Sequence, residues 1–105
     1  MLRLAPDHFA ARVNMGSALT EVGRFAEAIT LFQQANEIRP SYMAYSNLGT
    51  IYSRSFRYPE AVEAYQRALK HNDSDWLAWG NLGYVYSWME GKETESREAF
   101  DRAIE

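Results

Sequence analysis

The 105-residue chain contains no cysteine. That absence excludes a disulfide framework, a thiolate zinc site, an iron–sulfur cluster and a cysteine nucleophile. Its two histidines, His8 and His71, are too far apart for a local metal-ligand pattern, so no metal or other cofactor is expected. A basic excess is also lacking, because 11 basic residues stand against 14 acidic ones, a net charge of −3. Nucleic acid and anionic membranes are therefore not expected partners.

Long apolar runs are missing as well. No stretch approaches the ~20 residues that a transmembrane helix needs, and Arg3, Asp7 and His8 interrupt the segment where a signal peptide would lie. A cytoplasmic location is the resulting expectation. Hydrophobic residues make up 47% of the chain, which is too many for a disordered segment and enough for one small globular domain.

An internal repeat is the main feature that the sequence does have. The pattern Asn-Met/Leu-Gly occurs three times and places Gly16, Gly49 and Gly83 33 and then 34 residues apart. A second pattern of small, aromatic and small residues follows each glycine, as Ala28, Phe32, Ala35; Ala61, Tyr65, Ala68; and Ser96, Phe100, Ala103. The spacing of this second pattern predicts one extra residue in the third unit, near Gly91.

Each unit is predicted to form two helices, because its apolar residues recur every three or four positions and no segment alternates as a strand would. Gly23 and Gly91 fall between the helices of the first and third units. Ser41 is an expected N-cap, and Pro59 suits the first position of a helix. The expected helices cover residues 11–22, 25–38, 44–54, 59–71, 75–89 and 94–104.

Two segments, 45–52 and 79–86, share the order aromatic-x2-Leu-Gly-x2-Tyr. They resemble the signature of the tetratricopeptide repeat family. Residues 12–19 are a weaker copy, in which Arg12 stands where the family has an aromatic side chain. The resemblance implies an all-α fold, an α-solenoid of three antiparallel helix-turn-helix pairs that forms a right-handed superhelix.

The repeat boundaries follow from this alignment. Residues 1–8 align with the end of the first repeat and are expected to be the tail of a preceding repeat. The three repeats are then expected to span 9–41, 42–75 and 76–105, the third without a capping helix. Two readings stay open: a fragment of a longer array, or a short native protein whose ends dimerise. In either reading Phe100, Ala103 and Ile104 are expected to form an exposed apolar strip for self-association.

Small residues in the repeat are expected to be the points where the two helices of a pair approach most closely, since a larger side chain would push the helices beyond their ~8–10 Å packing distance. The aromatic residues of the second helices would fill the space that these glycines leave. Tyr52 is expected to help fill the same layer. The aromatic side chains in question are Phe32, Tyr65 and Phe100.

The resemblance also implies that the first helix of each pair lines a concave groove that binds a peptide. Asn14, Asn47 and Asn81 share one column there, and amide side chains can hold a peptide backbone through two hydrogen bonds. They form either a binding ladder or a structural feature bonded locally or to water. Other expected groove residues are Ser17, Glu21, Met43, Thr50, Arg54, Tyr84 and Trp88.

Tyr84 and Trp88 lie one helical turn apart and are the expected aromatic anchor, because aromatic residues dominate binding hot spots. Trp88 has an alternative role, which is to pack beneath the inserted loop near Gly91. Some members of the family bind the acidic C-termini of chaperones with a clamp of three cationic residues and two asparagines. That clamp is not expected here, since none of the three cationic positions holds a cation and only Asn47 matches. The clamp positions correspond to Val13, Ser17, Asn47, Leu77 and Asn81.

Catalysis is not expected, because no serine, histidine and acid stand in a nucleophile pattern. The carboxylates Glu93, Glu95 and Glu98 are expected to be a solvated helix face. The leading hypothesis is therefore a protein–protein interaction module that binds a peptide segment of a partner. The alternatives are a structural spacer or self-association region of a larger protein, and RNA binding by a related helical-pair repeat, which the acidic balance disfavours.

Overall fold

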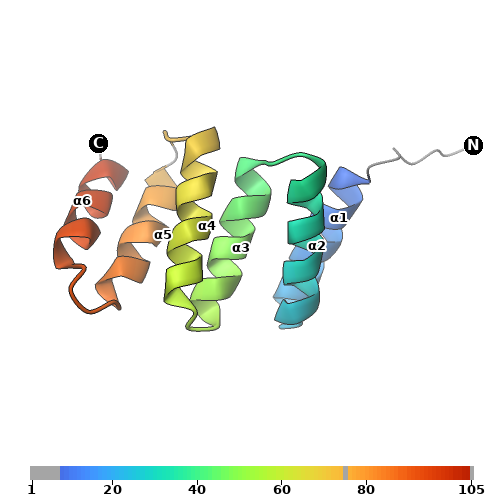
Figure 1. The fold of residues 1–105 in the computed structure, drawn as a ribbon, viewed down its shortest axis with the longest axis horizontal. Coiled ribbons are helices and arrows are strands. Elements are labelled where there is room, and N and C mark those ends of the chain that lie inside the picture. Colours follow the sequence, from blue (N-terminus) through green and yellow to red (C-terminus); the bar gives the residue numbers. More distant parts are fainter. Residues whose placement is uncertain (1–7, 75, 105) are drawn as a thin grey trace, which may run out of the picture.

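The computed structural model describes residues 8–74 and 76–104, and these form six helices and no strand. Consecutive helices run antiparallel and stack side by side into one elongated array (Figure 1). The all-α solenoid expected from the repeat is confirmed. The helices are α1 (Phe9–Glu21), α2 (Phe25–Ile38), α3 (Tyr42–Arg54), α4 (Tyr58–His71), α5 (Trp76–Ser87) and α6 (Glu93–Ala103).

Each helix pair is built around one glycine–aromatic contact. A Cβ atom on Gly49 would lie 2.8 Å from the ring of Tyr65, and one on Gly16 would lie 2.9 Å from the ring of Phe32. Atoms that close repel one another, so only glycine allows the helices to approach this far. Gly83 faces Phe100 in the same way, at 3.0 Å. The predicted role of the glycine column is confirmed in all three pairs.

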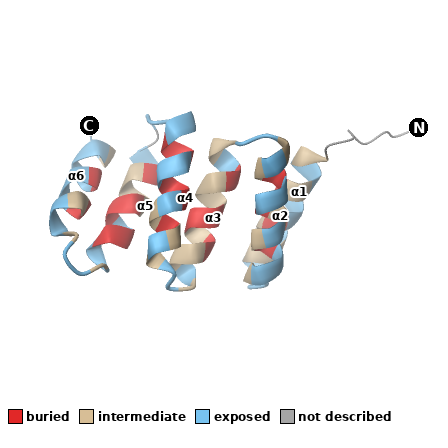
Figure 2. Cartoon of the chain, in the orientation of Figure 1, coloured by how far each residue is buried: buried red, intermediate tan, exposed pale blue. Residues whose placement is uncertain are grey.

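The apolar core consists of two clusters that meet at the middle of the array. One joins α1, α2 and α3 with Ala64 in the middle of α4, and the other joins α4, α5 and α6. Tyr52 packs against both clusters, so it links the first two pairs to the third. Buried residues lie where the helices face one another, and the second helices expose their outer sides (Figure 2). A single pair could not bury such a face alone.

The three turns within the pairs share a left-handed backbone residue. Gly23 has φ 84°, Gly91 has φ 79°, and Phe56 occupies the same position of the second turn with φ 64°. Glycine tolerates this conformation freely, whereas a bulky L-residue does so at a cost of about 1–2 kcal/mol. The turn between α5 and α6 covers residues 88–92 and is longer than those at 22–24 and 55–57, so the extra residue of the third repeat lies there.

The helix ends depart slightly from the sequence-based boundaries. Ser41 does cap α3, since its side-chain oxygen accepts a hydrogen bond from the Ala44 N–H at 3.1 Å. Pro59 is the second residue of α4 and not the first, because Tyr58 is already helical. α5 ends at Ser87 and not at residue 89, because the chain tightens into i→i−3 bonds before Gly91. Asp75, expected to begin that helix, lies outside the described residues.

The helices form two layers, and the layers differ in spacing. Cα atoms of α3 approach those of both α1 and α5 within 8 Å, whereas in the described residues no such approach links α2 with α4 or α4 with α6. Elements on the inside of a curved stack lie closer together than those on the outside. The first helices therefore form the inner face, and the second helices form the outer face. Within the described ranges, no helix has the length and apolar character needed to cross a membrane.

Candidate functional site

A small pocket of about 130 Å³ opens on the inner face between α1 and α3. It brings together five of the residues expected from the sequence, and it adds Thr20 of α1, which the sequence analysis did not single out. Met43 and Asn14, also expected in the groove, do not line this pocket. The lining residues are Ser17, Thr20, Glu21, Asn47, Thr50 and Arg54.

The three asparagines lie one on each first helix. Asn14 is exposed, and Asn47 and Asn81 are half-buried. Over the described ranges, none of their side-chain amides has a hydrogen-bond partner within the protein. Each amide can therefore offer its acceptor and its two donors to a ligand or to water. The local hydrogen bonding that was one alternative for this column is not seen.

The Thr50 hydroxyl, in contrast, is already engaged. It lies 2.9 Å from the Tyr65 hydroxyl and donates to the Ser46 carbonyl at 3.2 Å. Burial raises the pKa of Tyr65 above its ordinary value of 10.0, and the hydrogen bond from Thr50 and the charge of Arg54 offset this only in part. The bond ties α3 to α4 behind the pocket, so Thr50 shapes the pocket wall and has little hydrogen-bonding capacity left.

Exposed aromatic side chains occupy the far end of the inner face. Tyr84 is 52% exposed and Trp88 is 60% exposed. Their ring centroids are 6.1 Å apart with an interplanar angle of 72°, an edge-to-face arrangement. The alternative that Trp88 packs beneath the loop near Gly91 is wrong, because a side chain this exposed is not covered by that loop. Leu77, 52% exposed, lies earlier on the same helix.

The residues expected to self-associate differ in their exposure. Ile104 is 84% exposed and Phe100 is 43% exposed, whereas Ala103 is half-buried. The ring of Phe100 also covers Gly83, so one side of this ring belongs to the core and the other faces outward. The strip is therefore apolar and partly accessible.

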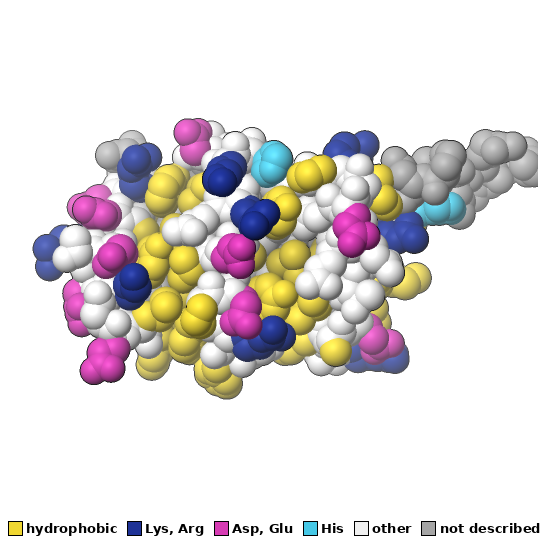
Figure 3. Space-filling view, in the orientation of Figure 1, with side chains coloured by type: hydrophobic (Ala, Val, Ile, Leu, Met, Phe, Trp, Pro, Cys, Tyr) yellow, Lys and Arg dark blue, Asp and Glu magenta, His cyan; other side chains and the backbone are white. Residues whose placement is uncertain are grey.

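Sequence reasoning missed two pockets on the outer face. The first, of about 320 Å³, lies between α2 and α4 above α3, and the second, of about 300 Å³, lies between α4 and α6 above α5. They open because the second helices stand apart. Hydrophobic side chains form the floor between these helices, and acidic and basic side chains surround them (Figure 3).

The two outer pockets are related by the repeat. Tyr45, Leu48 and Tyr52 of the first correspond to Trp79, Leu82 and Tyr86 of the second, 34 residues on. Four residues of α4 likewise correspond to four of α6, 35 residues on. These two sets of corresponding residues were the signal in the sequence from which the outer pockets could have been predicted. The α4 and α6 residues are Glu60, Glu63, Ala64 and Arg67, and Glu95, Glu98, Ala99 and Arg102.

An arginine lies over an aromatic ring at one end of each outer pocket. The Arg67 guanidinium is 6.0 Å from the centroid of Tyr45, and that of Arg102 is 4.8 Å from Trp79. Arg67 also donates to Glu63 at 3.1 Å, and this bond raises the pKa of Arg67. In the first repeat the arginine is on the other helix. Arg12 of α1 stands at the aromatic position and donates to Gln34 of α2, which stands at the arginine position, at 3.1 Å. The departure at Arg12 thus keeps a contact between the two helices.

Among the described residues, no group of three or more histidine or carboxylate side chains could hold a metal ion. Glu95 and Glu98 line the second outer pocket, and Glu95 pairs with Lys92 at 3.9 Å.

Three stacked antiparallel helix pairs, joined through a repeated glycine–aromatic contact, define the class of helical-repeat solenoid proteins. Tetratricopeptide repeat models match residues 7–74 and 46–105. The chain belongs to the tetratricopeptide repeat family.

Curated relatives are much longer than this chain. Human protein O-mannosyl-transferase TMTC3 is 29% identical over 105 residues, which is 98% of this chain and 12% of that protein. Small glutamine-rich tetratricopeptide repeat-containing protein 2 of Mycosarcoma maydis is 40% identical over 63 residues, 59% of this chain and 18% of that protein. The chain thus spans less than a fifth of the length of these relatives, and the activity in the first name belongs to that whole protein.

Solved structures share the fold at low sequence identity. MamA MSR-1 C2 superposes with a TM-score of 0.84 at 23% identity, covering 95% of this chain and 57% of that one. The second repeat domain of Spaghetti (RPAP3), bound to the HSP90 peptide SRMEEVD, superposes with a TM-score of 0.85 at 18% identity. That match covers 91% of this chain and 84% of the other. These likenesses establish the fold.

Proposed function

We propose that this chain binds a peptide segment of a partner protein along its inner face. The observation that carries the proposal is the exposed pair formed by Tyr84, on α5, and Trp88, directly after the end of α5, which are 52% and 60% exposed. Large aromatic side chains gain most from burial and are enriched at binding hot spots. Two such side chains that contact each other and are exposed to water are typical of a surface that binds another protein.

The polar end of the inner face complements this anchor. Asn47 and Asn81 have no protein partner for their amides within the described ranges, so they can bond to the carbonyl and N–H of an extended peptide. Glu21 and Arg54 line the pocket between α1 and α3 and supply one charge of each sign. This surface suits an extended, largely uncharged peptide. One apolar residue of the peptide would contact the aromatic end, and its backbone would face the asparagines.

A displayed random-peptide library tests the proposal. Peptides selected on the wild-type protein are expected to lose at least about tenfold in affinity on Trp88→Ala, since a hot-spot truncation costs more than about 1–2 kcal/mol. Asn47→Ala with Asn81→Ala is expected to weaken them as well. Selected peptides that bind all these variants as tightly as the wild type would contradict groove binding.

The chain offers a matched control for Trp88. Trp76 is the first residue of α5 and is 66% exposed, but it lines a different hollow with Ala103 and Ile104. Trp76→Ala removes the same kind of side chain from a different surface. It is expected to leave the affinity of the selected peptides unchanged.

An acidic C-terminal peptide such as SRMEEVD is a useful negative probe. Its carboxylates need cations, and the corresponding positions here hold Val13, which is buried, and Leu77. Calorimetric titration is expected to show no binding. Retention of tight binding would mean that cations elsewhere on the inner face replace the missing clamp.

Self-association through Phe100, Ala103 and Ile104 is the second candidate, and the 84% exposure of Ile104 favours it. Sedimentation equilibrium is expected to show a mass that rises with concentration. Ile104→Glu is expected to shift the chain toward monomer, since it places a charge in the contact. A monomer mass at all concentrations would exclude this candidate.

A further inference from the structure

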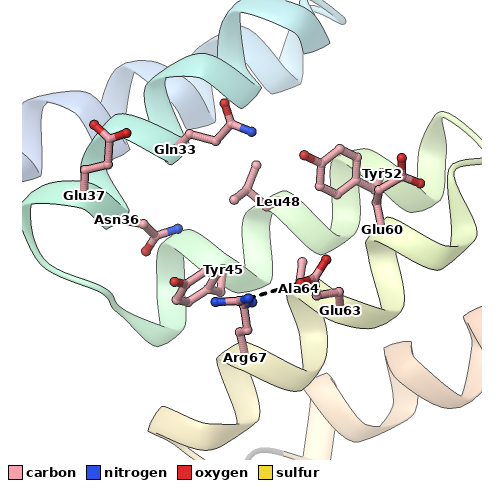
Figure 4. A pocket seen from close by; sticks show the side chains of 10 residues that line it. All are labelled: Gln33, Asn36, Glu37, Tyr45, Leu48, Tyr52, Glu60, Glu63, Ala64 and Arg67. Carbon is pink, nitrogen blue, oxygen red and sulfur yellow. Dashed lines mark hydrogen bonds and ion pairs between the residues drawn. The ribbon is translucent and has the colours of Figure 1, made fainter.

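One polar group in the first outer pocket has no partner. The Asn36 side-chain nitrogen Nδ2 is fully buried and lacks a hydrogen bond, although the oxygen of the same amide accepts one from the Ser41 N–H at 3.2 Å. A buried donor without a partner destabilises the folded state, because it has lost its hydrogen bond to water. This nitrogen is turned toward Leu48 and Tyr45 at the centre of the pocket (Figure 4). Asn36 as a whole is half-buried and lines the pocket, so a small turn of its amide would present this donor to an acceptor on a ligand.

The second outer pocket provides an internal comparison, because it carries no such defect. Leu69 stands at the position of Asn36, and Gln66 donates to the Tyr86 hydroxyl at 3.1 Å across the pocket. The matching pair in the first pocket is Gln33 and Tyr52, and no hydrogen bond joins them among the described residues. The first pocket therefore differs from its repeat copy in having polar groups that are free to bind.

The charges around the first pocket favour a cation. Glu37, Glu60 and Glu63 line it against one cation, Arg67. Arg67 neutralises Glu63, and an arginine outside the lining, Arg57, pairs with Glu60 at 3.2 Å. Glu37 alone has no ion pair among the described residues. The region thus keeps one unbalanced carboxylate even when that outer arginine is counted.

The side chains of Tyr45 and Tyr52 stand on the pocket wall. Their rings already have partners within the protein, since Arg67 lies 6.0 Å and His71 5.9 Å from the Tyr45 centroid and Arg57 lies 4.8 Å from the Tyr52 centroid. A pocket of about 320 Å³ is also within the range of known ligand sites, although at its lower end. The amide donor without a partner and the carboxylate without an ion pair together match a short peptide segment that carries a basic side chain.

We propose that this outer pocket is a second binding site, which takes an extended peptide segment carrying a lysine or arginine. A backbone carbonyl of the segment accepts the hydrogen bond from Asn36, and the cationic side chain of the segment lies near Glu37. The site faces away from the inner groove and does not depend on it. One array could then hold two segments at once, an uncharged or apolar one inside and a basic one outside.

Nuclear magnetic resonance titration tests this site directly. The probes are the blocked tripeptides Gly-Lys-Gly and Gly-Gln-Gly, which have the same backbone and differ in charge. The side-chain amide signals of Asn36 are expected to shift and saturate with the lysine peptide, with about tenfold weaker binding of the glutamine peptide. The signals of Asn47 and Asn81 on the inner face are expected to stay in place.

Two substitutions replace residues of the first outer pocket with those found at the equivalent positions of the next repeat. Glu37→Lys, which introduces the counterpart of Lys70, is at an exposed position and is expected to weaken the lysine peptide about tenfold or more. Asn36→Leu, which introduces the counterpart of Leu69, is expected to weaken both peptides. Should Asn36→Leu fail to fold, Glu37→Gln carries the test.

The proposal is overturned if the Asn36 signals do not saturate, if both peptides bind equally, or if Glu37→Lys binds like the wild type. Trp88→Ala is expected to bind the lysine peptide normally. This control separates the outer site from the inner groove, so that failure of one does not count against the other.

Discussion

The glycine–aromatic contact is the residue-scale feature on which each helix pair rests. Gly49 can be tested by Gly49→Ala, because the new Cβ atom would lie 2.8 Å from the buried ring of Tyr65. Overpacking of this kind costs about 1–3 kcal/mol, which exceeds the gain of up to ~1 kcal/mol from replacing glycine in a helix. Urea unfolding is expected to show a lower unfolding free energy for the variant.

Gly80 provides the control for that substitution. A Cβ atom there would meet only the Cβ of Ala103, at 3.9 Å, which is an ordinary contact. Gly80→Ala is therefore expected to be neutral or to stabilise by up to about 1 kcal/mol. If both alanine variants lost the same stability, close approach would not be the reason for the glycine column.

The Tyr65 hydroxyl predicts a pH dependence. Burial raises the pKa of Tyr65 above 10.0, so the folded state holds this proton more tightly than the unfolded state does. Its contribution to stability is fully present below about pH 10 and is lost as the pH rises through the folded value. Tyr65→Phe lacks that proton and also lacks the bond to Thr50.

Measurements at two pH values separate these effects. At pH 8 the wild type is expected to be about 1 kcal/mol more stable than Tyr65→Phe, which is the contribution of the lost hydrogen bond. At pH 11 this difference is expected to shrink. The exposed residue Tyr84 supplies the control, Tyr84→Phe. A difference between wild type and Tyr65→Phe that stays constant with pH would contradict the assignment.

At the scale of the helix, the cap of α3 is the clearest determinant of where an element begins. Ser41 accepts a hydrogen bond from the Ala44 N–H, which would otherwise be unsatisfied. Ser41→Ala is expected to lower the unfolding free energy by about 1 kcal/mol in chemical denaturation. Ser53→Ala, within the same helix, leaves the cap intact and is expected to change stability by less than about 0.5 kcal/mol. Equal effects of the two would argue against the cap.

Helix positions could be predicted from the sequence, but their last turns could not. The three-to-four spacing of apolar residues located all six helices, and Ser41 was identified because its chemistry is local. The end of α5 was misplaced by two residues, because the longer turn before Gly91 tightens the chain. Turn geometry depends on where the next helix must pack, and a residue pattern does not contain that information.

At the scale of the whole molecule, stability is expected to be uneven along the array. The central helices α3 and α4 have neighbours on both sides, whereas α1 and α6 have a neighbour pair on one side within the described chain. In a solenoid each repeat gains stability only from adjacent repeats. The buried residues agree, since α4 buries five residues and α1 and α6 bury two each.

Native-state hydrogen exchange measures this gradient. Amides of α3 and α4 are expected to exchange only through global unfolding, and those of α1 and α6 through cheaper local opening. The wild-type chain at several low denaturant concentrations is sufficient for the measurement. Equal protection of α6 and α4 would mean that the array unfolds as a single cooperative unit with no end effects.

The repeat period and the small–aromatic alternation were enough to determine the family, the helix pairs and the residues that join each pair. These features are local or recur at a fixed interval, so they can be seen in one sequence. The candidate groove was predicted in part, since Ser17, Asn47 and Thr50 do meet in one pocket. The engagement of the Thr50 hydroxyl by Tyr65 could not be foreseen, because it depends on how α3 faces α4.

Only the tertiary structure decided the outer pockets, the exposure of Trp88 and the unpaired amide of Asn36. The outer pockets depend on the distance between helices that are not adjacent in the chain, α2 and α4 for one pocket and α4 and α6 for the other. The first helices lie close together and the second helices lie apart, so the second helices leave hollows above α3 and α5. A sequence specifies which faces of its helices are apolar, but the spacing of stacked pairs follows from the packing of all their side chains at once.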